Sequence, residues 1–179
     1  MWSERPWFVW PAAVDPGWCA ALAERLRSAP FTDEALGLHG NFCYERLAEP
    51  ELDALVRAKL EEASFVTELS ARVGRPLAPS VEGLVKRVDS APHRRFPWHS
   101  DGSRGREIAV SLSLSAGPVQ GGRFQLRRKW SAELLADLAQ GRPGDVHAFE
   151  VGDPTLVHRV TPVEGPEPRV FFAGWYRGA

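Results

Sequence analysis

Hydrophobic positions follow two different periods along the chain. In the first part, apolar residues recur at intervals of three and four, which predicts helices over residues 16–28 and 50–73. Asp15 is a favourable N-cap for the first helix, and Gly74 is a favourable terminator for the second. From residue 80 onward the apolar period falls to two, which is typical of strands. Helices are therefore expected first and strands afterwards.

The second part of the chain contains six apolar segments bounded by proline, glycine and aspartate. A short helix with a serine cap is also expected there, at residues 131–140. Helices followed by closely spaced strands favour a sandwich or jelly roll in which the helices support one sheet. We expect a single domain over residues 1–179, with helical support over about 1–78 and a jelly-roll core over about 80–177. The expected strands are 81–88, 107–115, 121–128, 144–151, 155–160 and 169–177.

The expected strand at residues 107–115 has two chemically different faces. Such a strand suits the inner wall of a ligand pocket, and it equally suits an antiparallel strand with one solvated face. Both interpretations stay open at the level of sequence. The apolar face carries Ile108, Val110, Leu112 and Leu114, and the small or polar face carries Ala109, Ser111, Ser113 and Ser115.

Composition narrows the possible partners. Twenty-two basic and 23 acidic residues leave a formal charge of −1, so no electrostatic argument favours nucleic acid or an anionic membrane. The two cysteines form no Cys-x-x-Cys pair, which argues against a thiolate zinc site and against a disulfide framework. No signal peptide and no apolar run long enough to span a bilayer is recognisable, so we expect a cytoplasmic protein.

Three separated residues form a candidate metal site. His99 and Asp101 lie two positions apart, so in an extended segment their side chains point to the same side. His158, in a later strand, is the best third ligand. Two histidines and one carboxylate on one face of a metal are the ligands of non-haem Fe(II) centres. The alternative is that His99 lies near a turn that Asp101 caps, and that His158 is an unrelated core residue.

Arg169 is the second unusual residue. It begins the very apolar segment at residues 169–177. A guanidinium is costly to bury without an anion, and it forms bidentate pairs with carboxylates. An exposed arginine at the start of a strand is the alternative.

Several short motifs, in their order along the chain, resemble those of the Fe(II)/2-oxoglutarate-dependent oxygenases, and most closely the prolyl-4-hydroxylase-like branch. The similarity covers about residues 80–177, and the segment at 8–26 also resembles the strand and cysteine-containing helix that open those proteins. The motifs are HSD (99–101), GGRF (121–124), GD (144–145), HRVTPV (158–163), Arg169 and GW (174–175).

The resemblance implies a double-stranded β-helix and a mechanism. His99, Asp101 and His158 would be the catalytic residues that hold Fe(II), and Arg169 would pair with the far carboxylate of 2-oxoglutarate. With O2 as co-substrate, the reaction would hydroxylate an unactivated C–H bond and release succinate and CO2. Ascorbate is a candidate reductant.

The chain also departs from the family pattern. The family often has one tyrosine where Val88, Asp89 and Ser90 stand here and another near Ser113, so Ser111, Ser113 and Thr161 become candidate partners of 2-oxoglutarate. Candidate substrate-binding residues are Trp98, Arg123, Gln125 and Trp175, with ordinary packing as the alternative for each; Arg87 is a similar case.

An amino-acid-like, peptide or carrier-bound substrate is expected, with neither nucleic acid nor membrane as a partner. The competing hypothesis is a cupin-like jelly roll that binds a metal or ligand without oxygenase chemistry. Arg169 distinguishes the two, because a metal site without 2-oxoglutarate has no need of it.

Overall fold

The protein has three layers in a computed structural model that describes residues 5–36, 42–94, 96–102 and 105–179. Helices α1 (Pro16–Ser28), α2 (Pro50–Leu60) and α3 (Ala63–Val73) cover one face of a seven-stranded sheet. A four-stranded sheet faces the other side of that larger sheet. This arrangement confirms the expected jelly roll, with the helices supporting one sheet.

The larger sheet is antiparallel throughout and extends beyond the jelly roll at both edges. Its strand order is β1-β9-β6-β11-β4-β3-β2, so β1 adds one edge and the β2–β3 hairpin adds the other. The bounds are Trp7–Trp10 (β1), Val146–Glu150 (β9), Arg106–Ser113 (β6), Arg169–Arg177 (β11), Glu82–Val88 (β4), Phe42–Leu47 (β3) and Phe31–Leu36 (β2). The pattern of hydrophobic residues did not predict β2 or β3.

The smaller sheet has the order β5-β10-β7-β8. Its strands are Phe96–His99 (β5), Leu156–Val160 (β10), Phe124–Arg128 (β7) and Leu134–Leu138 (β8). In this sheet His158 lies directly opposite His99, so two distant segments bring their imidazoles together.

The prediction of a helix at residues 131–140 is wrong, because the middle of this segment forms β8. Its backbone pairs with β7, and Ala136 is buried opposite Leu126. Ser131 does accept a backbone N–H from Glu133, but it closes a turn instead of capping a helix. The cross-strand ladder thus overrides the local preference for a helix.

The helix expected at residues 50–73 is in fact two helices. α2 ends at Leu60, and Glu62 is extended before α3 begins (φ −56°, ψ 133°). The apolar spacing changes at this point from four to five residues, between Leu60 and Phe65. The break allows both halves to bury their apolar sides, since Leu60 and Phe65 both belong to the same core. The end at Gly74, with φ 73°, is confirmed.

The main hydrophobic core lies between the helices and the larger sheet. Tyr176 of β11 donates a hydrogen bond to the Leu60 carbonyl at 2.6 Å, and Asp53 of α2 accepts one from the Val85 N–H at 2.7 Å. Within the described ranges, no helix is both long and apolar enough to cross a membrane. With one face of the larger sheet covered by helices, its other face is left to form the wall of a site. Core residues include Leu22, Leu26, Val56, Leu69, Val85, Ile108, Leu112 and Phe172.

Candidate active site

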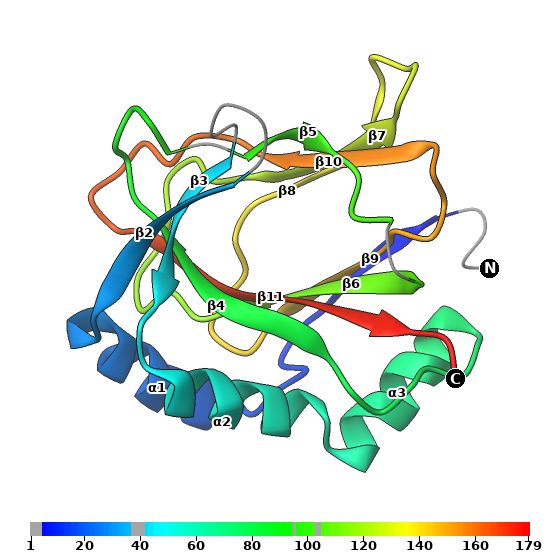
Figure 1. The fold of residues 1–179 in the computed structure, drawn as a ribbon, viewed down its shortest axis with the longest axis horizontal. Coiled ribbons are helices and arrows are strands. Elements are labelled where there is room, and N and C mark those ends of the chain that lie inside the picture. The colour runs from blue at the N-terminus through cyan, green and yellow to red at the C-terminus, as the bar shows by residue number, and fades with distance from the viewer. Residues whose placement is uncertain (1–4, 37–41, 95, 103–104) are drawn as a thin grey trace.

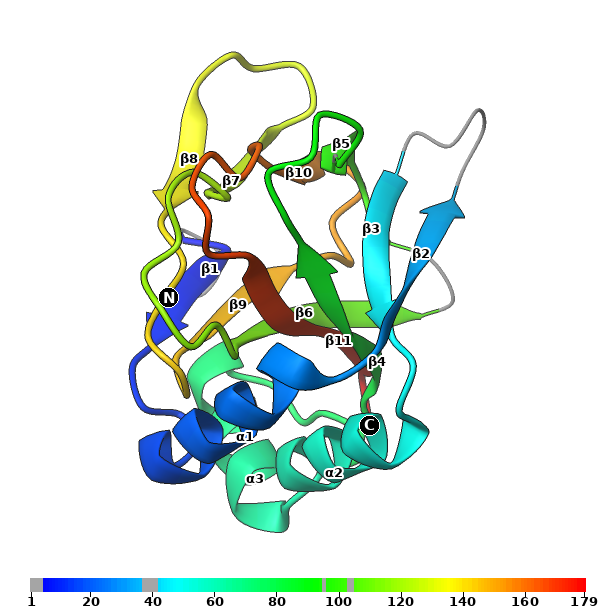
Figure 2. The same ribbon diagram turned by 90° about the vertical axis from the view of Figure 1, so that its left-hand side faces the viewer.

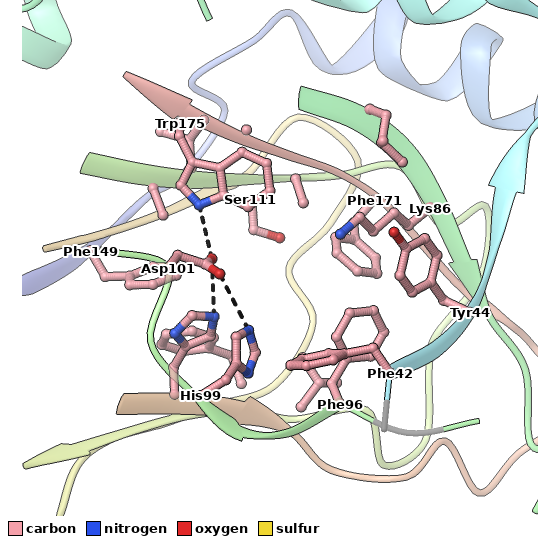
Figure 3. A pocket seen from close by; sticks show the side chains of 18 of the residues that line it. Phe42, Tyr44, Lys86, Phe96, His99, Asp101, Ser111, Phe149, Phe171 and Trp175 are labelled. Carbon is pink, nitrogen blue, oxygen red and sulfur yellow. Dashed lines mark hydrogen bonds and ion pairs between the residues drawn. The ribbon is translucent and has the colours of Figure 1, made fainter. Parts of the chain in front are cut away.

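A cavity of about 530 Å³ opens between the two sheets. This volume is in the range of sites for small molecules. Aromatic rings and aliphatic side chains form most of its wall, and a few polar groups project into it (Figure 3). Ala109 and Ser111 line it from β6, so the small face of that strand is a pocket wall. Other lining residues include Phe42, Tyr44, Lys86, Phe96, His99, Asp101, Phe124, Phe149, His158, Arg169, Phe171 and Trp175.

His99, Asp101 and His158 meet at one end of this cavity. His99 ends β5, Asp101 follows two residues later, and His158 lies in β10. The Nε2 atoms of both histidines lie 3.5 Å from oxygens of Asp101, on Oδ1 for His99 and Oδ2 for His158. One donor atom from each residue lies within 4.8 Å of the other two, which is close enough for a shared metal ion.

The protonation states suit a metal. The Nδ1 of His99 lies 2.7 Å from the Pro97 carbonyl, so it carries the proton and leaves Nε2 free. Burial lowers the pKa of His99, and burial together with the neighbouring His99 lowers the pKa of His158 to about 3. Burial acts to raise the pKa of Asp101, but the two imidazoles and the Trp175 N–H outweigh it and hold that pKa below its usual value. The cluster therefore offers two neutral imidazole nitrogens and one carboxylate, a donor set that fits Fe(II).

Trp175 orients the carboxylate of the cluster from the opposite sheet. Its indole Nε1 donates a 2.8 Å hydrogen bond to Asp101 Oδ2, which crosses the cavity (Figure 3). The guanidinium of Arg106 lies over the Trp175 ring, 3.9 Å from its centroid. A hydrogen bond of this kind fixes which oxygen of the carboxylate faces a metal.

Arg169 is a buried cation that lacks an acidic partner. It is 1% exposed, and it lines the same cavity as the cluster of His99, Asp101 and His158. Its Nε donates to Gln140 Oε1 at 2.6 Å and its Nη1 to the Gly122 carbonyl at 2.9 Å. Among the described residues no carboxylate pairs with it, and burial lowers its pKa to about 9. At neutral pH the guanidinium is therefore charged, and an anionic ligand would complete its environment.

The structure does not bring every candidate residue to the cavity. Ser113 is buried outside the lining residues, and the Thr161 hydroxyl accepts the backbone N–H of Arg123 at 2.9 Å. Ser111, one step along β6 from Ser113, does line the cavity. It is therefore better placed than either Ser113 or Thr161 to contact a ligand.

Three candidate substrate residues instead lie on the outer face of the smaller sheet. Arg127 and Arg159 both lie against the Trp98 ring, with guanidinium carbons 4.3 Å and 4.8 Å from the ring centroid. Gln125 accepts a 2.8 Å hydrogen bond from Arg159, and Arg123 pairs with Asp137 at 2.7 Å. His99 faces the cavity and its neighbour Trp98 faces outward, and the irregular register between β5 and β10 lets Phe96 face the cavity as well.

Several polar residues of the cavity were not among the candidates from sequence, and Lys86 is the most deeply buried base among them. Lys86 of β4 is only 8% exposed, and its ammonium lies 4.4 Å from the centroid of the Tyr44 ring. Period-two alternation places it on the face opposite Val85, which lies in the core under the helices. This alternation was the feature of the sequence that could have identified Lys86 as a cavity residue.

No family model and no curated protein matches the sequence. Solved structures do match its fold. A Pseudomonas putida prolyl-4-hydroxylase is 16% identical with a TM-score of 0.71, covering 99% of this chain and 95% of that one. A prolyl hydroxylase from Trichoplax adhaerens, in complex with a peptide fragment of hypoxia inducible factor, is 14% identical with a TM-score of 0.71, covering 99% and 86%.

A third similar structure is the epimerase SnoN in complex with Fe³⁺, alpha ketoglutarate and nogalamycin RO. It is 15% identical with a TM-score of 0.68, and the match covers 99% of this chain and 81% of that one. The resemblance to 2-oxoglutarate–Fe(II) oxygenases, prolyl-4-hydroxylases included, is thus confirmed at the level of the fold over nearly the whole chain.

Proposed function

We propose that this protein is an Fe(II)- and 2-oxoglutarate-dependent dioxygenase. It hydroxylates an unactivated C–H bond of an amino-acid-like, peptide or carrier-bound substrate and releases succinate and CO2. The observation that carries this proposal is the buried, uncompensated Arg169 in the same cavity as the cluster of His99, Asp101 and His158. A metal site alone leaves Arg169 unexplained, so the cupin-like alternative is the weaker hypothesis.

Each part of the site has a defined task in this proposal. His99, Asp101 and His158 hold Fe(II), which with 2-oxoglutarate and O2 supplies the oxidising power for C–H hydroxylation; ascorbate serves as reductant. Arg169 holds the far carboxylate of 2-oxoglutarate and so fixes the orientation of the keto acid. The aromatic walls keep water away from the reacting groups. Complexes with a peptide fragment and with nogalamycin RO among the similar structures support both peptide and small-molecule substrates.

The proposal is tested by anaerobic titration with Fe(II) and 2-oxoglutarate. Chelation of Fe(II) by the keto acid should produce a weak visible charge-transfer band, and admission of air with candidate substrates should produce succinate. Absence of both signals would favour the cupin-like alternative.

A variant of Arg169 separates binding of the keto acid from binding of the metal. Arg169→Met keeps the volume of the side chain and removes its charge, so 2-oxoglutarate should bind about tenfold more weakly or worse. Metal affinity should change less than about twofold, because Arg169 contacts none of the three metal ligands. Arg123→Met, on the outer face, is the matched control and should leave both affinities unchanged. Equal loss of both affinities in Arg169→Met would instead indicate a damaged fold.

A further inference from the structure

Lys86 is a second buried cation of the cavity, and its surroundings differ from those of Arg169. Figure 3 shows its side chain directed into the cavity from β4. Its Nζ lies 4.4 Å, 5.5 Å and 5.7 Å from the ring centroids of Tyr44, Phe96 and Trp175. No described residue forms a hydrogen bond or an ion pair with this ammonium group. Among the described residues its N–H donors therefore have aromatic ring faces as partners, and no oxygen or nitrogen acceptor.

The nearby charges do not neutralise Lys86. Asp101 and Glu34 are the carboxylates that favour its charged form, yet neither lies within ion-pair distance. Asp101 belongs to the metal cluster, and Arg106, the other nearby cation, pairs with Glu82. Glu34 lies opposite Tyr44 in the β2–β3 pairing and lines the same cavity. Burial of the ammonium lowers its pKa to about 8, so it is mostly charged at neutral pH.

The ammonium group of Lys86 needs a hydrogen-bond acceptor when a ligand occupies the cavity. Water can solvate the ammonium in the ligand-free protein, but a ligand that displaces this water must supply acceptor atoms in its place. Otherwise the ammonium group loses its solvation without replacement, and this cost weakens the binding of the ligand. A carboxylate is the acceptor that best matches an ammonium group. The three rings around Lys86 would at the same time pack against an apolar part of the ligand.

The two cations project into the cavity from neighbouring strands of the larger sheet, on either side of Phe171, but they have different partners. Arg169 is held by Gln140 and by the carbonyl of Gly122, which precedes β7. Lys86 instead lies against Tyr44 of β3 and Phe96 of β5. The co-substrate already occupies Arg169 in the proposed function, which leaves Lys86 for a different anion.

We propose that Lys86 binds a carboxylate of the organic substrate, so that the substrate is a free acid with an apolar portion. That the anion belongs to a substrate rests on the proposed oxygenase function. The substrate class then narrows to amino-acid-like or peptide molecules that carry a free carboxylate beside the oxidised portion. A primary amide of the same shape is rejected, because it leaves the ammonium without a charged partner.

The probes are pairs of N-acetylated apolar amino acids and their primary amides. Calorimetry on the metal-free wild-type protein should show the acids binding about tenfold or more tightly than the amides. Lys86→Met should abolish this preference, whereas Arg169→Met and the surface variant Lys129→Met should retain it. A preference that survives in Lys86→Met, or is absent from the wild type, overturns the proposal.

A second measurement separates Lys86 from the co-substrate. In anaerobic titrations with Fe(II), the affinity of Lys86→Met for 2-oxoglutarate should stay within about twofold of wild type. A tenfold loss would assign Lys86 to 2-oxoglutarate and overturn the proposal. If the wild type gives no charge-transfer band but keeps its Lys86-dependent preference for acids, the proposed oxygenase function fails and the carboxylate site remains.

Discussion

Lys86 and Arg87 are neighbouring basic residues on β4 whose side chains lie on opposite faces of the sheet. Arg87 pairs with Glu45 at 2.6 Å, while Lys86 enters the cavity. Period-two alternation predicts that the two residues face opposite sides, but the sequence of one strand does not tell which side is the inside. That depends on how β4 pairs with β11 and β3. Arg169 was identifiable because it begins a strand that is otherwise apolar, whereas Lys86 lacked such a context.

The uncompensated charge of Lys86 should cost stability. Replacing it in Lys86→Met removes a buried charge and keeps an apolar side chain of similar length, so the variant should be more stable at pH 7 by about 2–3 kcal/mol. The folded pKa of about 8 lies below the ordinary value of 10.5, so between these values the unfolded chain binds more protons than the folded one. The stability of the wild type therefore rises through this window relative to that of the variant.

Urea unfolding of both proteins at pH 7, 8, 9 and 10 tests this linkage. The advantage of Lys86→Met should be full below pH 8 and should shrink steadily toward pH 10. An advantage that stays constant across this range would show that packing, and not the buried charge, is the cause.

Among the secondary-structure elements, the apolar pattern of the sequence correctly predicted α1 and most strands of the jelly roll. The α1 helix and strands β4, β6, β9, β10 and β11 follow clear patterns, because each has a single well-defined buried side or a continuous apolar run. It failed for β8, which has a helix-like composition but is held by the β7 ladder. It also failed for β2 and β3, whose acidic residues Asp33 and Glu45 form ion pairs with Arg94 and, for Glu45, with Arg87 of β4.

These unpredicted strands supply part of the site. Tyr44 and Phe42 of β3 line the cavity, and Tyr44 stacks on Phe96 with centroids 5.3 Å apart. The cluster of His99, Asp101 and His158 could be predicted from sequence, because imidazole and carboxylate groups at this spacing are typical of a metal site. The aromatic wall could not, because an aromatic ring in a strand serves a core and a pocket equally well.

The contact between β4 and β11 depends on a pair of glycines. Gly83 lies opposite Gly174, and a Cβ at Gly83 would come within 2.6 Å of both the Phe172 ring and the Gly174 Cα. Gly83→Ala should therefore lower the free energy of unfolding by about 1–3 kcal/mol, because backbone must move to admit the methyl group.

Urea unfolding measures this effect, with Gly17→Ala as the matched control. Gly17 is exposed in the first turn of α1, and only the Asp15 carboxylate lies near its added methyl group, at 3.3 Å. The control should change stability by less than about 0.5 kcal/mol. A Gly83→Ala protein as stable as wild type would mean that the two strands are not as close as described.

At the scale of the whole molecule, the proposed ligands divide between the two sheets. The metal ligands belong to β5, β10 and the residues just after β5, all in or beside the smaller sheet. Arg169, Trp175 and Lys86 project from the larger sheet. The hydrogen bond from Trp175 to Asp101 joins the two sheets across the cavity. A keto acid held by the metal at one end and by Arg169 at the other would join them a second time.

Amide hydrogen exchange should show the metal and 2-oxoglutarate protecting the two sheets one after the other. A redox-inert divalent metal such as Zn²⁺ should slow amide exchange in β5 and β10, where its ligands lie, and should affect β11 little. Adding 2-oxoglutarate should then extend the protection to β11, because its far carboxylate fixes Arg169 at the start of that strand. In Arg169→Met the first step should persist and the second should be lost. If 2-oxoglutarate deepens protection only in β5 and β10 of the wild type, Arg169 is not its partner and the cavity holds the keto acid differently.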